Sequence, residues 1–244
     1  MKKILAVSAA LAIILSSLFL NGCEDKKQTK STTATTSTTA PAKTDKDQKN
    51  TSKELKEYLD SFTKGDNPVY GTWKIEGIKA LSYIFRNDGY AQLAMGTEAD
   101  FTKLVLDKDK KTLGVAFVLG LNGTYNYTFS KGNKVLTLKS DKDSFTLTRQ
   151  KDYNLIPPAP KNPKIDKNIL GWWKSQGGQT YFFGSDGIMY SNNITMETCY
   201  TYNAVKGKIK AVYDYAGKVK INLDYKLKKD SLYIDNVEYR KSKP

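Results

Sequence analysis

The tetrapeptide GTWK at residues 71–74 recurs as GWWK at 171–174, and this repetition decides how the fold is read. A second stretch, YIFRNDG at 83–89, recurs as YFFGSDG at 181–187. The first pair is offset by 100 residues (171 − 71) and the second by 98 (181 − 83), so order and spacing are kept with a two-residue gap. Repetition at a fixed period predicts copies of one folding unit.

Two further matches follow in the same order. YNY at 125–127 corresponds to YTY at 200–202, and LTR at 147–149 corresponds to EYR at 238–240. Four matches in one order are not expected by chance. The chain is therefore predicted to carry two related units.

Apolar and polar residues alternate over short runs within each unit, and turn residues such as NDG at 87–89 separate the runs. Alternation with a period of two is typical of half-buried strands, and no helix long enough for a parallel crossover fits between the turns. We therefore predict an all-β fold: two small antiparallel up-and-down barrels in tandem, at 66–152 and 167–244, of about eight strands each.

Two other segments flank the predicted barrels. Residues 153–166 are rich in proline, which predicts a stiff, extended linker. Residues 52–65 carry apolar side chains at helical spacing, with TSKE at 51–54 as a capping box and Gly65 as a C-cap. We expect a short amphipathic helix that packs on the domain after it.

The N-terminus has the pattern of an export signal. Lys2 and Lys3 precede an uncharged apolar run, and LNGC follows at 20–23. The run can nearly span a bilayer, but LNGC resembles the bacterial lipobox, in which the cysteine is acylated before cleavage. The resemblance implies a lipoprotein signal peptide at 1–22 and lipid attachment, by acyl chains such as palmitate, at Cys23. It places the protein on the extracytoplasmic face of the cell membrane.

Residues 23–51 are rich in Thr, Lys and Ser after the cysteine and carry no large apolar side chain. Such a composition cannot bury enough surface to offset its ordering entropy. We predict a disordered tether with a root-mean-square reach of roughly 30 Å.

Gly-x-Trp on the first strand of each unit, with an arginine on the last, resembles the signature of lipocalins and their relatives. In that family the arginine packs across the tryptophan at the closed end of the barrel. The resemblance implies structural cation–π pairs of Trp73 with Arg149 and of Trp173 with Arg240. Each unit is about half as long as a ligand-carrying lipocalin, so side chains can fill its interior.

GWWK at 171–174 and the residues after it are also similar to one choline-binding wall repeat. Those repeats stand in tandem at about twenty residues, whereas this motif recurs only once, after the 100-residue offset. The lipocalin resemblance is the better interpretation.

Several features argue against catalysis. The chain has no histidine, which removes the commonest general base and transition-metal ligand. Asp88 and Asp186 would form an acid–base pair only if the two units faced each other, and their place before glycine is typical of turns. Cys199 is interpreted as a small apolar strand residue, because an acylated Cys23 cannot pair with it. We expect no enzyme activity, no cofactor and no metal.

Charge suggests the partners. Loss of Lys2 and Lys3 lowers the formal net charge from +14 to +12. The chain has only three arginines and its lysines are scattered, so we expect no nucleic-acid binding. The expected function is binding of a small apolar ligand or an envelope component through the lipocalin-like domains. The alternative is a cell-wall adhesin or structural spacer that is attracted to anionic lipid or wall polymers through its basic surface. The oligomeric state stays open.

Overall fold

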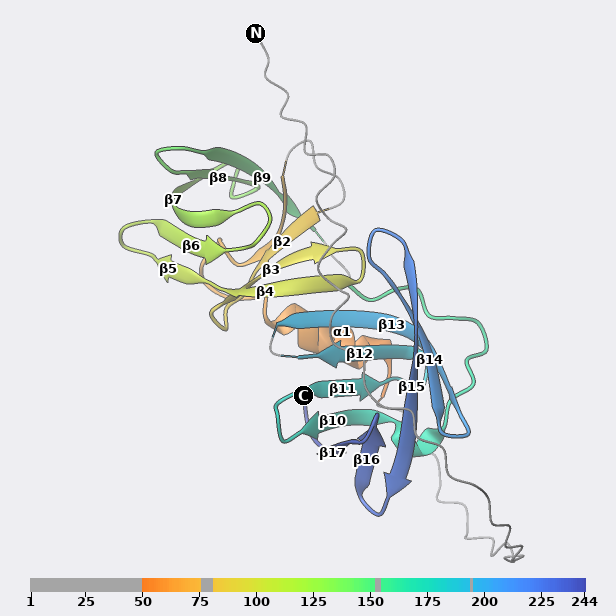
Figure 1. Cartoon of the computed structure of the whole chain (residues 1–244). Helices are drawn as coiled ribbons and strands as arrows, with labels where there is room; N and C mark the ends of the chain where they lie inside the picture. The colour runs from red at the N-terminus through yellow and green to blue at the C-terminus, as the bar shows by residue number, and fades with distance from the viewer. Residues whose placement is uncertain (1–49, 76–80, 152–154, 194) are drawn as a thin grey trace, which may run out of the picture. The chain divides into compact units, whose positions relative to one another are not determined.

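The computed structural model describes residues 50–75, 81–151, 155–193 and 195–244, which form a predominantly antiparallel β-structure with one α-helix (Figure 1). The predicted signal peptide, Cys23 and all but the end of the predicted tether lie outside the described residues. No helix among the described residues is long and apolar enough to cross a bilayer.

The described elements follow one another in a simple order. Helix α1 spans Ser52–Ser61, and the short 3-10 helix η1 spans Lys167–Ile169. The strands before η1 are β1 (Gly71–Ile75), β2 (Leu81–Phe85), β3 (Tyr90–Met95), β4 (Glu98–Lys103), β5 (Val105–Asp107), β6 (Thr112–Ala116), β7 (Asn122–Ser130), β8 (Val135–Lys139) and β9 (Ser144–Gln150). The strands after it are β10 (Gly171–Ser175), β11 (Thr180–Phe183), β12 (Ile188–Asn192), β13 (Met196–Val205), β14 (Lys208–Asp214), β15 (Lys218–Lys228), β16 (Ser231–Ile234) and β17 (Val237–Lys241).

Strands β10 to β17 form a closed antiparallel barrel of eight strands. Each strand pairs with the next, and β17 pairs back with β10. Large side chains fill its core, among them Trp173, Phe183, Tyr202 and Tyr239. This is the up-and-down arrangement that the alternating pattern predicts.

Strands β1 to β9 form a second set of pairings with a core of its own. Each strand pairs with the next except β4 and β5, which follow one another through the buried Leu104, and β9 pairs back with β1. Its core includes Trp73, Tyr83, Phe85 and Tyr125.

The match of YNY with YTY is wrong. YNY at 125–127 lies on β7, third from the end of its set of strands, whereas YTY at 200–202 lies on β13, fifth from the end of the other. The two segments therefore occupy different places in their sheets. Alternating tyrosines arise wherever aromatic side chains point into a core at every second residue, so the match was not specific.

A short antiparallel pairing between β4 and β13 joins the two sets of strands. Ala99 lies opposite Glu197 at its centre, and 197 − 99 equals 98, the offset that separates the repeated YIFRNDG and YFFGSDG segments. Met196 lies opposite Asp100 and Thr198 lies opposite Glu98, so each pair is the counterpart of the other. Equivalent strands thus meet about a local pseudo-twofold axis, as in an isologous dimer interface.

Through this pairing the strands β2-β3-β4-β13-β12-β11-β10 form one continuous sheet. Helix α1 packs against this sheet (Figure 1). Leu55 of the helix is fully buried in a cluster with Ile84 from one set of strands and with Trp172 and Phe182 from the other. Strands β2 and β11 are therefore buried on both faces, which explains their continuous apolar runs.

The two equivalent turns of the repeat hold opposite ends of α1. At its N-terminus, the Asp186 carboxylate accepts from the backbone N–H of Ser52 at 2.8 Å. At its C-terminus, the Asn87 side-chain amide donates to the carbonyls of Ser61 at 2.9 Å and Lys64 at 2.6 Å. These contacts satisfy backbone groups that a helix leaves unpaired at its ends.

The predicted caps of this helix are wrong. Thr51 occupies the N-cap position but makes no side-chain capping bond, and Glu54 instead accepts from Trp172 Nε1 at 3.0 Å. The helix ends at Ser61 with Phe62 as its C-cap, before Gly65. Tertiary partners have replaced the local capping box, because the end of the helix lies against the turn that carries Asp186.

A buried polar network lies beside the β4–β13 pairing. Glu197, which is fully buried, accepts from Arg86 Nη1 at 2.9 Å, from Gln92 Nε2 at 2.6 Å and from the Tyr190 hydroxyl at 2.9 Å. The Arg86 guanidinium carbon also lies 3.8 Å from the centre of the Phe62 ring. A buried ion pair of this kind is satisfied only while both sets of strands and α1 stay together.

We predict that Glu197→Ala lowers the free energy of unfolding by about 3–5 kcal/mol, because it leaves the Arg86 guanidinium buried without its partner across the pairing. Urea unfolding followed by circular dichroism measures this. The control is Glu57→Ala on the exposed face of α1, for which a change within about 0.5 kcal/mol is expected. Equal, small effects of both variants would contradict the role given to Glu197.

Candidate functional site

Strands β14 and β15 and their flanking turns carry a concentration of lysine. Residues 206–229 contain eight lysines and two aspartates, and every lysine is exposed. Along β14 and β15 the lysines alternate with residues that point into the barrel, so the pleat puts them on one outer face. We call this the lysine face, and it comprises Lys208, Lys210, Lys218, Lys220, Lys226 and Lys228 of the two strands together with Lys206 and Lys229 of the flanking turns.

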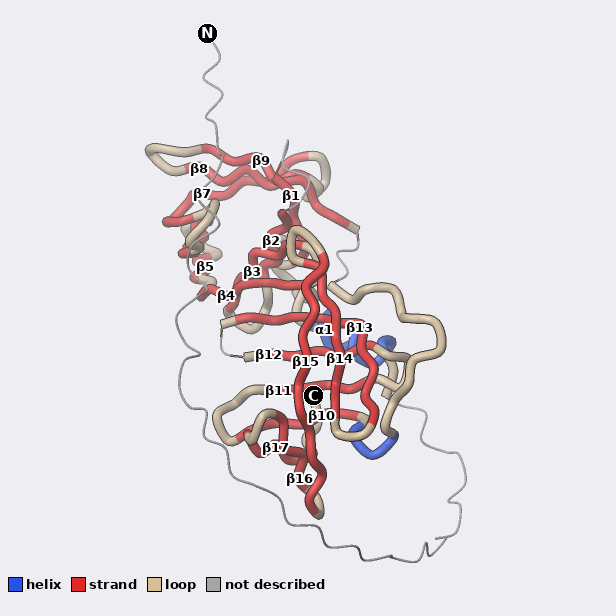
Figure 2. Tube along the Cα trace, turned by 45° about the vertical axis from the view of Figure 1, so that its right-hand side comes forward, coloured by secondary structure: helices blue, strands red, loops and turns tan. Residues whose placement is uncertain are grey.

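Few of these ammonium groups are neutralised within the described part of the chain. Lys208 pairs with Asp224, and Lys228 lies 5.2 Å from the centre of the Tyr233 ring. Figure 2 shows β14 and β15 running side by side along much of the β10–β17 barrel. Neighbouring lysines on one face of a strand are about 6.8 Å apart, which suits repeated contact with an extended polyanion.

The other set of strands shows that the fold does not require this charge. β6 and β7 hold the places in their set that β14 and β15 hold in theirs, and residues 112–130, which contain them, have no charged side chain. Exposed positions there are small and neutral, such as Thr124, Asn126 and Thr128. The lysine face is therefore a feature of β14 and β15 that has no counterpart on β6 and β7.

The sequence interpretation of scattered lysines missed this surface. The signal that could have found it is the period of two in KGKIK at 206–210 and in KVKINLDYKLK at 218–228. On a barrel strand, that period places every lysine outside and every apolar residue inside.

A row of directly opposed residues leads from the lysine face across the outer surface. It crosses β15, β16, β17, β10, β11 and β12 in turn, and its members are Lys228, Ser231, Arg240, Lys174, Thr180 and Asn192. Residues opposed in an antiparallel sheet share a face. The basic surface thus continues as far as β10.

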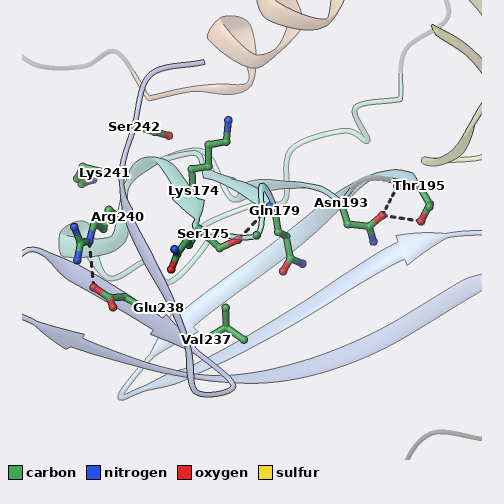
Figure 3. A pocket seen from close by; sticks show the side chains of 12 residues that line it. Lys174, Ser175, Gln179, Asn193, Thr195, Val237, Glu238, Arg240, Lys241 and Ser242 are labelled. Carbon is green, nitrogen blue, oxygen red and sulfur yellow. Dashed lines mark hydrogen bonds and ion pairs between the residues drawn. The ribbon is translucent and has the colours of Figure 1, made fainter. Parts of the chain in front are cut away.

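The row runs into an open groove, shown in Figure 3, which is formed by the β10–β11 turn, the β12–β13 turn and β17. Most of the residues that line it are polar or charged, among them Lys174, Gln179, Asn193 and Glu238. We call it the β10–β17 groove.

The interior of the β10–β17 barrel, in contrast, is filled by side chains. The core of β10–β17 contains Tyr181, Phe183, Tyr202 and Tyr239, and burial raises the pKa of Tyr239 to about 12. A filled core leaves the outer surface as the place for contact with another molecule.

Trp73 and Arg149 lie opposite each other on β1 and β9, with the guanidinium carbon 4.2 Å from the centre of the indole ring. Arg149 also donates to the carbonyl of Tyr70 at 3.0 Å, and Trp73 Nε1 donates to the carbonyl of Val69 at 2.8 Å. A side chain at Gly71 would meet the Arg149 guanidinium, and the φ of +137° at this position is one that L side chains rarely adopt. The glycine of Gly-x-Trp is thus needed for this close approach.

In the barrel of β10 to β17, Lys241 and not Arg240 lies over the tryptophan. Its ammonium nitrogen is 4.1 Å from the centre of the Trp173 ring and donates to the carbonyl of Leu170. Arg240 is exposed and pairs with Glu238. Lys241 is directly opposite Trp173, whereas Arg240 is opposite Lys174 on the outer face. The alignment of EYR with LTR was one residue out of register, and such a slip moves a side chain to the other face of a strand.

The remaining candidate residues, Asp88, Asp186 and Cys199, make contacts that stabilise the fold. Asp88 accepts from Arg86 and Asp186 from Ser52, so the two aspartates serve turns at opposite ends of α1. Cys199 is fully buried, and burial, with the nearby Glu197, raises the pKa of its thiol well above the usual value. The described residues contain no group of three or more Cys, Asp or Glu placed to hold a metal ion.

Comparisons of the chain with protein-family models, with curated proteins and with solved structures give no match.

Proposed function

We propose that this chain is a lipid-anchored, extracytoplasmic and non-enzymatic protein that binds an anionic polymer of the cell envelope. The observation that carries the proposal is the lysine face, which gathers unneutralised ammonium groups on two adjacent strands of one barrel. Wall polymers and lipid headgroups are the polyanions that an exported protein meets. Attraction through such a face is electrostatic, and salt screens it.

The contrast between the two copies supports the proposal. Basic residues occur in both copies, but only in the second do they line two adjacent strands, since the corresponding strands β6 and β7 carry no charged residue between positions 112 and 130. The filled cores favour an envelope component on the outer surface over a small apolar ligand inside a barrel.

The architecture that we propose is a tandem of two lipocalin-like barrels. In this proposal β4 and β5 act as one strand bent at Leu104, so that β1 to β9 form an eight-stranded counterpart of β10 to β17. The support is the cation over tryptophan in both copies, Arg149 on Trp73 and Lys241 on Trp173. In both copies the indole also donates to a carbonyl four residues earlier, that of Val69 or Ile169.

The anchor rests on the sequence. LNGC at 20–23 provides the acylation site at Cys23, and the polar residues after it provide a tether long enough to hold the barrels away from the lipid.

Replacing four lysines of β15 tests the proposed surface. We predict that Lys218→Gln, Lys220→Gln, Lys226→Gln and Lys228→Gln together weaken binding to isolated anionic wall polymer by about tenfold or more at 0.15 M salt. The measurement is the Kd from a titration of immobilised polymer, repeated at several salt concentrations.

The matched control removes the same charge from the other copy, by Lys131→Gln, Lys134→Gln, Lys139→Gln and Lys142→Gln, all at exposed positions. A change of about twofold or less is expected, because net charge alone does not set the contact. Equal weakening by both variants would show nonspecific attraction and would refute the surface.

For the anchor, Cys23→Ser is expected to move the protein from the membrane fraction to the soluble fraction, or to leave it as an uncleaved precursor, and to abolish labelling by radioactive palmitate. Cys199→Ser serves as the control and should keep both membrane association and label, since its buried thiol has no part in acylation. Palmitate label retained by the Cys23 variant would exclude the proposed anchor.

A further inference from the structure

The β10–β17 groove offers hydrogen-bonding groups of a different kind from the lysine face. Uncharged polar side chains make up much of its lining, including Gln176, Gln179, Asn193, Thr195 and Ser242. Charged groups stand among them, with Lys174 and Arg240 on adjacent strands. A mixture of amides, hydroxyls and a few charges matches sugar hydroxyls, which both donate and accept.

Asn193 is held in a fixed orientation. Its side-chain oxygen accepts from the backbone N–H of Thr195 at 2.9 Å and from the Thr195 hydroxyl at 3.0 Å (Figure 3). The same oxygen accepts from the backbone N–H of Met196 at 2.8 Å. The oxygen is therefore occupied, and the Nδ2 group has no partner among the described residues. This gives the groove a donor that is oriented before a ligand arrives.

Other groups of the groove lack partners as well. Ser242 Oγ has no hydrogen-bond partner within the described part of the chain. One oxygen of Glu238 accepts from Ser231 at 2.7 Å and from Arg240 Nε at 3.3 Å, and no bond to its second oxygen is seen in the same part of the chain. Polar groups of the groove that make no bond within the protein can bond a ligand hydroxyl.

The groove lies at the end of the basic row that begins at Lys228. From this juxtaposition we infer that the bound polymer is an anionic polysaccharide: its acid groups lie along the lysine face, and one of its sugar units occupies the β10–β17 groove. The inference rests on the proposed function and names its substrate class. It distinguishes a glycan that carries acid groups from a polyanion without sugars.

Three soluble polymers separate the two contributions. Polygalacturonate has carboxylates and sugar hydroxyls, linear polyphosphate has charge without sugars, and dextran has sugars without charge. We expect the full chain in detergent to bind polygalacturonate most tightly, polyphosphate more weakly and dextran not measurably. Binding of polyphosphate as tight as that of polygalacturonate would overturn the inference and leave the proposed function standing.

A charge-neutral variant tests the groove itself. Gln176→Ala with Ser242→Ala removes two polar groups that make no side-chain bond in the described structure, so folding should be preserved, as a thermal melt would verify. The expected result is about tenfold weaker binding of polygalacturonate, with polyphosphate binding changed by about twofold or less.

The matched control is Ser144→Ala with Gln150→Ala on β9, which should leave both affinities unchanged. Unchanged polygalacturonate affinity in the groove variant, or equal loss for both polymers, would overturn the inference. The lysine variants of β15 are expected to weaken both polymers, so failure of the groove is distinguishable from failure of the lysine face.

Discussion

The antiparallel pairing of β4 with β13 is the constraint on which the rest of the described structure depends. It places Ala99 opposite Glu197, two positions separated by the repeat offset itself, so the copies meet as equal partners. The same geometry brings the two repeated turns to opposite ends of α1 and buries Arg86 against Glu197. An exposed strand edge invites pairing with other chains, and here each copy covers the edge of the other.

This internal pairing determines which surfaces remain available. The outer faces of β2, β3, β11 and β12 are buried against α1 and against the residues that follow β9, such as Leu155 and Ile156. The outer faces of β14 and β15 are left exposed, and they carry the lysines. In both sets of strands a cation lies over the tryptophan of the first strand, whereas the row of exposed lysines is present on one set only. The proposed function is built on that difference.

Sequence patterns predicted the elements better than their contacts. The period of two predicted antiparallel strands. Gly-x-Trp marked the first strand of each copy, and at Gly71 the Arg149 side chain lies close to the backbone. The prediction that Arg240 packs on Trp173 was wrong by one residue. Sequence alone does not show which of the adjacent Arg240 and Lys241 lies opposite the tryptophan. The predicted caps of α1 were wrong because the partner of Ser52, Asp186, is 134 residues away in the sequence, and capping rules consider only neighbouring residues. The lysine face was readable from its alternation, whereas the groove, assembled from three separate segments, was not.

Lysine footprinting tests the central claim most directly. The full chain would be acetylated under limiting reagent with and without isolated anionic wall polymer, and each lysine quantified by mass spectrometry. The account predicts strong protection at Lys210, Lys218, Lys220 and Lys226, with little change at the exposed Lys131, Lys134, Lys139 and Lys142 of the other copy. Uniform protection of both groups, or protection of the second group alone, would contradict it.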